Sequence, residues 1–134
     1  MLNSDVGHGR KVLVVDDVRI IADTLALILT QSGFESSVAY SGEDALQSAF
    51  ETKPDILITD VLMGKLSGID LAKFFHDRLP ECRVILFSGQ IATEGLLQSA
   101  KVEGYEFEAL PKPVSPRLFL DLLSEAPLKP APLY

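Results

Sequence analysis

Three aspartates directly follow short apolar runs, and their carboxylates could act together on one ligand. Asp16 and Asp17 come after KVLVV, and Asp60 comes after DILIT. Carboxylates gathered in one pocket repel each other, and burial raises their pKa values, unless a cation offsets the charge. Hard oxygen ligands with retained water suit Mg²⁺, so we expect Asp17, Asp60 and the backbone carbonyl of Leu62 as its direct ligands. Asp16 would act through a water molecule.

Asp60 also has the chemistry of a phosphoryl acceptor. A carboxylate is a competent nucleophile toward phosphorus and forms an acyl phosphate, as in the aspartyl-phosphate ATPases. Both groups of acids have structural explanations as well. Asp16 and Asp17 fit a helix N-cap pair, and Asp60 fits a strand-terminal residue that caps a loop. Taken one residue at a time these explanations are favoured, and the joint placement is what indicates chemistry.

Ser88 and Lys112 extend the same set, because each stands at the end of a further predicted strand. Lys112 is a compact cation that can pair with Asp60 at rest and with a phosphoryl oxygen afterwards. The Ser88 hydroxyl can donate to a phosphoryl oxygen, and its reorientation could pull the following loop, which would be a two-state switch. Alone, Lys112 fits an exposed surface lysine better, and Ser88 fits an ordinary strand-end serine.

The elements that must position these residues alternate between strand and helix. Apolar runs typical of parallel strands buried on both faces occur at 11–15, 55–59 and 83–88, and more polar strands are expected at 34–40 and 106–111. Helical spacing occurs over 17–32, 42–52, 67–79 and 92–103, and from Ser115-Pro116 onward. This order predicts an α/β fold, a (βα)5 doubly wound five-stranded parallel sheet with the flavodoxin-like order 2-1-3-4-5. Ligands bind at the carboxyl ends of such strands, where all the candidate residues fall.

Apolar stripes predict which helix faces are buried. The first three stripes are Ile21, Leu25, Ile28 and Leu29; Ala45, Leu46, Ala49 and Phe50; and Ile69, Leu71, Ala72 and Phe75. Ser41, with Asp44 three residues later, predicts an N-cap. Other polar residues favour structural roles: a solvated edge for Glu103, Glu106 and Glu108, a solvated helix position for His76, and a buried small residue at Cys82.

Composition excludes several classes of function. The chain has 134 residues, and 12 Lys and Arg against 19 Asp and Glu give a formal net charge of −7, which disfavours nucleic-acid binding. It has no apolar run long enough to cross a membrane and no secretory h-region. A single cysteine excludes an internal disulfide framework. We therefore expect a cytoplasmic protein with neither nucleic acid nor membrane as a partner.

The motifs VLVVDD, DILITDVLM, VILFSG and LPKP together resemble the receiver domain of bacterial response regulators. The resemblance implies that Asp60 is the phosphoacceptor and that Asp16 and Asp17 are the acidic pair for Mg²⁺. It implies that Ser88 is the switch hydroxyl and Lys112 the phosphoryl partner. A histidine kinase or histidine phosphotransfer protein would donate the phosphoryl group, and the receiver would catalyse its own phosphorylation and dephosphorylation without being a conventional enzyme. On this basis 1–10 is a flexible lead-in, 11–125 the receiver domain, and 126–134 a Pro-rich tail or truncated linker.

Three positions depart from the family pattern. Gly64 stands where proline is usual, and Ala109 stands where the family often has Tyr or Phe. We therefore expect signalling to run through the Ser88 loop and the following helix. Leu62 is apolar where the family residue flanks the acyl phosphate, which predicts a long-lived phosphate. Output is expected through protein contact over the face built by 91–125, with a phosphorylation-dependent homodimer left open.

Several functional alternatives remain open. The chain could be a stand-alone chemotaxis-type receiver, a phosphorelay intermediate, or an excised fragment of a longer regulator. A pseudo-receiver would bind partners without phosphorylation, although it has little reason to keep three converging carboxylates. A phosphatase of the haloacid dehalogenase type is disfavoured, because Leu62 replaces the second aspartate which that chemistry needs.

Overall fold

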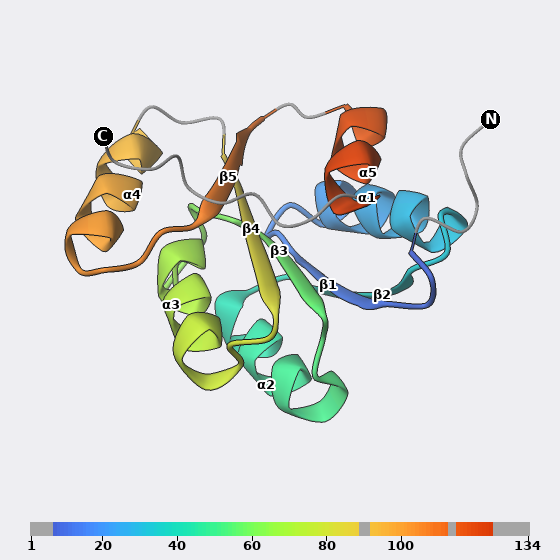
Figure 1. Ribbon diagram of the computed structural model, residues 1–134, viewed down its shortest axis with the longest axis horizontal. Coiled ribbons are helices and arrows are strands. Elements are labelled where there is room, and N and C mark those ends of the chain that lie inside the picture. Colours follow the sequence, from blue (N-terminus) through green and yellow to red (C-terminus); the bar gives the residue numbers. More distant parts are fainter. Residues whose placement is uncertain (1–6, 89–91, 113–114, 125–134) are drawn as a thin grey trace.

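Five strands form the centre of the molecule, and helices cover both faces of the sheet (Figure 1). The computed structural model describes residues 7–88, 92–112 and 115–124. The elements are β1 (Lys11–Val15), α1 (Arg19–Gln31), β2 (Glu35–Ala39), α2 (Gly42–Thr52), β3 (Ile56–Asp60), α3 (Gly68–Arg78), β4 (Arg83–Ser88), α4 (Ala92–Val102), β5 (Glu108–Pro111) and α5 (Pro116–Ser124).

The sheet is parallel and has the order β2-β1-β3-β4-β5, which confirms the predicted doubly wound fold. The two central pairings align Val14 with Ile58 and Ile58 with Ile85. The three strands predicted from uninterrupted apolar runs are the central ones, because only a strand covered on both faces can bury every side chain. The more polar β2 and β5 are the two edges, as their composition predicts.

Alternate side chains of the strands enter different cores. Val12 and Val14 pack with residues of α1 and α5 on one face, whereas Leu13 and Val15 pack with residues of α2 and α3 on the other. A third cluster joins α3 and α4 to β4. Figure 1 shows the same division, with α1 and α5 on one side of the sheet and α2, α3 and α4 on the other.

Local sequence signals set two of the helix ends. The Ser41 hydroxyl accepts a hydrogen bond from the backbone N–H of Asp44 at 3.1 Å, which confirms the predicted N-cap of α2. After α1, Gly33 has a φ of +94°, in the left-handed region that favours glycine. The chain turns there into β2.

Two predicted core positions are wrong. Ile21 is 36% exposed and Phe50 is 62% exposed. On α1 the buried positions are Ala22, Ala26 and Leu29, because two small side chains let the helix lie close to the sheet while Ile21 turns outward. The ring of Phe50 instead packs edge-on against the ring of Phe74 on α3. The third stripe is buried as predicted: Ile69, Leu71, Ala72 and Phe75.

Part of the predicted lead-in is attached to the domain. The N–H of Gly7 donates to the carbonyl of Ser32 at 2.8 Å, and the N–H of Gly9 donates to the carbonyl of Gly33 at 2.9 Å. The Arg10 guanidinium donates to the carbonyl of Leu123 at 3.0 Å. Residues 7–10 therefore hold the end of α1 and the end of α5 at the same edge of the sheet.

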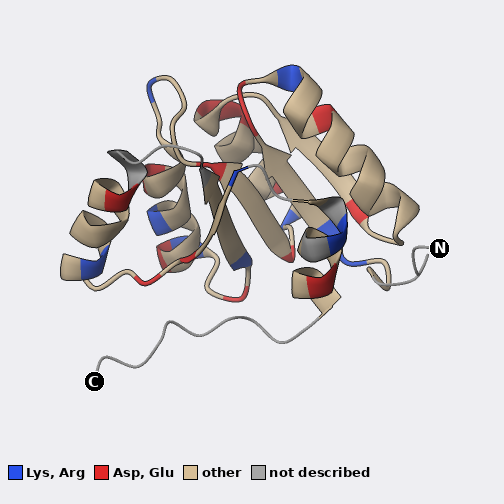
Figure 2. Cartoon of the chain, turned by 90° about the horizontal axis from the view of Figure 1, so that it is seen from above, with Lys and Arg blue, Asp and Glu red and all other residues tan. Residues whose placement is uncertain are grey.

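Charged residues lie on the helices and connecting loops, while the strands are largely uncharged except near their ends (Figure 2). Among the described residues, no helix is both long enough and apolar enough to cross a membrane.

Candidate functional site

The three predicted aspartates meet at the carboxyl edge of the sheet. Asp16 directly follows β1, and Asp60 is the last residue of the neighbouring strand β3. Carboxylate oxygens of Asp16, Asp17 and Asp60 all lie within 4.8 Å of one another. Asp16 and Asp60 are buried, and Asp17 is exposed. Adjacent parallel strands bring the acids together, although they are far apart in the sequence.

Lys112 reaches this cluster from the end of β5. Its Nζ lies 3.1 Å from Oδ2 of Asp16 and 3.3 Å from Oδ1 of Asp60. The same ammonium lies 4.8 Å from the ring centroid of Phe87, which is buried on β4 between β3 and β5. The predicted contact with Asp60 is therefore present, and the contact with Asp16 is one that the sequence did not indicate.

Both carboxylate oxygens of Asp16 are engaged. Oδ1 accepts a hydrogen bond from the backbone N–H of Val18 at 2.9 Å, while Oδ2 accepts one from Lys112. The first contact orders the chain just before α1, but the N-cap residue of that helix is Val18 and no side chain caps it, so the explanation of Asp16 and Asp17 as an N-cap pair is wrong. The second contact turns the carboxylate toward Asp60.

The electrostatic balance of the cluster favours a bound cation. Burial raises the pKa of Asp60 above its ordinary value, the charges of Asp16 and Asp17 raise it further, and the ammonium of Lys112 lowers it. The net effect is a raised pKa of Asp60, because burial is the largest of these influences. A divalent cation with oxygen ligands fits this donor set, since it would relieve the repulsion and leave positions for water and phosphate oxygens.

The remaining predicted site residues are placed less fully. Leu62 lies after β3 with 39% exposure, close in sequence to Asp60. Ser88 ends β4, beside β5, but its side chain lies outside the described part of the structure. Residues 89–91 also lie outside it, so the loop predicted to move with Ser88 stays a prediction.

Two residues beside Asp60 were missed by the sequence reasoning. The hydroxyl of Thr59 donates to the backbone carbonyl of Asp60 at 3.0 Å. Gly68, the first residue of α3, lies so close that an added Cβ would meet that carbonyl oxygen at 1.9 Å. One feature of the sequence could have indicated Gly68. It directly follows the N-cap residue Ser67, and glycine is a poor helix former.

Glu108 was wrongly predicted to belong to a solvated edge. It forms a two-pronged ion pair with Arg83, with contacts of 2.8 and 2.9 Å, and both side chains are 9% exposed. Arg83 also donates to the carbonyl of Leu122 at 3.4 Å. The pair joins β4, β5 and α5. Its charges are balanced, so it has the character of a structural contact.

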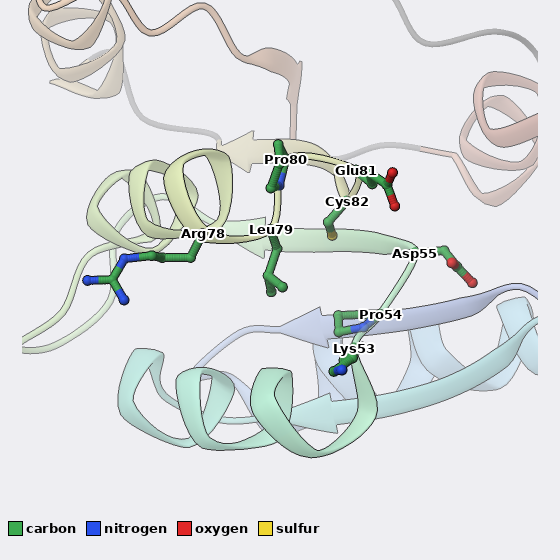
Figure 3. A pocket seen from close by; sticks show the side chains of 8 residues that line it. All are labelled: Lys53, Pro54, Asp55, Arg78, Leu79, Pro80, Glu81 and Cys82. Carbon is green, nitrogen blue, oxygen red and sulfur yellow. The ribbon is translucent and has the colours of Figure 1, made fainter.

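A separate cavity of about 350 Å³ opens at the amino edge of the sheet, away from the aspartate cluster (Figure 3). It lies where α2 and α3 end, with Lys53 and Arg78 on its rim and Cys82 against the sheet. Burial raises the pKa of the Cys82 thiol to about 12, so the thiol is protonated and unreactive at neutral pH. This fits the expected role of Cys82 as a small buried residue.

The fold and the acidic edge define a class of protein: a doubly wound domain with an aspartate cluster where its central strands end. Residues 12–124 match the family model described as the response regulator receiver domain. The chain therefore belongs to the receiver domain family of two-component signalling, as the sequence motifs indicated.

Relatives and solved structures agree with this assignment. The chain is 36% identical over 113 residues to a response regulator receiver protein of Anaeromyxobacter sp., covering 84% of this chain and 47% of that protein. It is 29% identical to the chemotaxis protein CheY of Thermotoga maritima, covering 87% of this chain and 97% of that protein. The structure of Vibrio cholerae CheY4 superposes with a TM-score of 0.75 at 27% identity, covering 86% and 96% of the two chains. The chain thus spans about half of the first relative and almost all of the second.

Proposed function

We propose that this receiver domain is a phosphorylation-controlled switch in which Asp60 accepts a phosphoryl group from a histidine kinase or a histidine phosphotransfer protein. The observation that carries the proposal is the placement of Asp60, within 3.3 Å of the Lys112 ammonium and beside two further carboxylates. A carboxylate oxygen of Asp60 would form the new O–P bond while the P–N bond of the donor phosphohistidine breaks. The imidazole nitrogen would be the leaving group.

Mg²⁺ fits the site as the cofactor. Asp17, Asp60 and the backbone carbonyl of Leu62 would hold it directly, and Asp16 would do so through water. When bound, the cation supplies positive charge that offsets the carboxylates and the transferring phosphoryl oxygens. Asp17 is exposed, so its carboxylate is accessible from solvent. The carboxylate of Asp16 is held in place by hydrogen bonds from the backbone N–H of Val18 and from the Lys112 ammonium.

Lys112 and Ser88 would hold the phosphoryl group once it is attached. Esterification of Asp60 removes the carboxylate charge and places phosphoryl oxygens near the ammonium, so the Lys112 contact would pass from the carboxylate to the phosphate. Ser88 ends the strand between β3 and β5, from where its hydroxyl would donate to a second phosphoryl oxygen. The receiver would thereby catalyse its own modification without being a conventional enzyme.

The switched state would be read by another protein. The face predicted for 91–125 includes α4, β5 and α5, which adjoin the β5 edge of the sheet, where β4 ends at Ser88 and β5 ends just before Lys112. Movement at the ends of β4 and β5 would therefore be transmitted directly to this surface. With Ala109 in place of an aromatic side chain, the segment after Ser88 would carry most of the change.

The test is intact-mass spectrometry after incubation with a small-molecule phosphodonor, with Mg²⁺ or with EDTA. We expect one added phosphoryl group that requires Mg²⁺ and is absent from Asp60→Asn. Asp121→Asn is the matched control, because Asp121 is an exposed aspartate on α5 and lies outside the cluster. Labelling of Asp60→Asn would place the acceptor elsewhere. An unlabelled wild-type chain that also fails to bind Mg²⁺ would favour the pseudo-receiver.

A further inference from the structure

The start of α3 lies against the backbone of the proposed acceptor. A Cβ on Gly68 would lie 1.9 Å from the carbonyl oxygen of Asp60, 2.8 Å from its carbonyl carbon, and 2.9 Å from Cα of Val61. The N–H of Gly68 also donates to the carbonyl of Val61 at 2.9 Å. All of the atoms in the way belong to the backbone, so no side-chain rotation can make room for a Cβ.

Two other glycines, one in the loop after β3 and one within α4, do not have this constraint. A Cβ on Gly64, in the loop after β3, or on Gly95, within α4, would meet nothing within 4 Å. Gly68 itself does not have a left-handed backbone, unlike Gly33. The requirement for glycine at 68 is therefore close approach to Asp60 and not backbone freedom. A helix accepts glycine at a cost of about 0.5–1 kcal/mol relative to alanine, which the close approach must offset.

We propose that Gly68 is a positioning residue for Asp60: its missing side chain lets α3 begin against the Asp60 carbonyl and fixes the direction of the acceptor carboxylate. The inference rests on the proposed function of Asp60. Thr59 contacts the same carbonyl with its hydroxyl, and the Ser67 hydroxyl caps α3 by accepting the N–H of Asp70 at 3.1 Å. The acceptor peptide is thus held between its own strand and the first turn of the next helix.

The expected consequence of a side chain at 68 follows from geometry. Contacts below 3.0 Å are essentially never made by a real Cβ, so the Asp60 peptide or the start of α3 must move by about 1 Å. A displacement of that size at a reacting group can reduce a rate by about a hundredfold. The contact of Lys112 with Asp60 would be disturbed by the same movement.

The test compares Gly68→Ala with Gly95→Ala, two single-methyl additions within helices. Phosphoryl incorporation from a small phosphodonor is followed by mass spectrometry over a series of donor concentrations at saturating Mg²⁺, and folding is checked by circular dichroism. We expect the maximal rate of Gly68→Ala to fall at least about tenfold with an unchanged half-saturating donor concentration. Gly95→Ala should keep the wild-type rate.

The outcomes separate this inference from the proposed function. An unlabelled wild-type chain overturns the proposed function and this inference with it. A labelled wild-type chain with folded Gly68→Ala at the same rate overturns the positioning role alone. A change confined to the half-saturating donor concentration also overturns it, because a positioning residue acts on the maximal rate.

If Gly68→Ala does not fold, a second pair of variants tests the positioning role of the start of α3. Ser67→Ala removes the cap of α3 beside Asp60, and Ser41→Ala removes a cap of the same geometry from α2. Neither substitution adds atoms. We expect Ser67→Ala to slow phosphoryl incorporation at least threefold more than Ser41→Ala at matched loss of stability. Equal rates in the two variants would overturn the positioning role.

Discussion

The molecule buries charged side chains in two regions, and the balance between positive and negative charge differs between them. At the carboxyl edge, the buried carboxylates of Asp16 and Asp60 share the ammonium of Lys112, and the exposed Asp17 lies beside them. Between β4 and β5, one guanidinium meets one carboxylate through two parallel contacts, and a helix carbonyl accepts a further hydrogen bond from the same guanidinium. Among the contacts of the described residues, the first group has an excess of negative charge, whereas the second pairs one positive with one negative group.

The difference shows how to separate a functional cluster from a structural one. A two-pronged ion pair stabilises both of its charges inside the protein, which is the character of a structural contact. An excess of carboxylates is unfavourable by itself, and the pKa of Asp60 is raised by burial and further by the charges of Asp16 and Asp17. A bound cation would offset this excess of negative charge.

The largest effect is expected from breaking the balanced pair. Arg83→Ala removes the guanidinium from the buried carboxylate of Glu108, which should reduce the free energy of unfolding by about 3–5 kcal/mol. Urea unfolding followed by circular dichroism measures it. Replacing both residues, as Arg83→Met with Glu108→Leu, should recover most of the loss. A loss below about 1 kcal/mol for the single variant would show that the pair is screened by solvent.

Adding Mg²⁺ should raise the free energy of unfolding through the aspartate cluster and not through the Arg83–Glu108 pair. At a concentration about a hundred times the dissociation constant, a ligand that binds only the folded state adds about 2.7 kcal/mol to the free energy of unfolding. Thermal unfolding should therefore shift upward with Mg²⁺ in the wild-type chain and in the Arg83→Met, Glu108→Leu double variant. An equal shift in Asp60→Asn would show that Asp60 is not a ligand.

The smallest effect is expected from neutralising the acceptor without metal. Because its pKa is raised in the folded state, Asp60 favours folding most below its ordinary pKa of 3.8, and this contribution is lost as the pH rises through the raised value. Asp60→Asn should therefore be more stable than wild type at neutral pH in EDTA, by on the order of 1 kcal/mol. The difference should vanish near pH 3.8, as urea unfolding at several pH values would show. A constant difference would indicate a cause other than the charge.

Much of the site was predictable because its residues stand at strand ends. Parallel strands end at one edge, so a sequence that places Asp16 after one apolar run and Asp60 after another also places them together once the strand order is inferred. Lys112 was found by the same argument. Gly68 was not, because the distance between a helix start and a strand carbonyl is not a property of either segment alone.

Sequence alone determined the elements, their order and the residues at the carboxyl edge, because hydrophobic periodicity and capping act over a few neighbouring residues. The tertiary structure decided which side of each helix is buried, as Ile21 and Phe50 show, since burial depends on the partner surface. It also decided that Glu108 meets Arg83 inside the protein while Lys112 meets both Asp16 and Asp60. Charge pairing between distant residues depends on three-dimensional distance and local burial, and the linear order of residues carries neither.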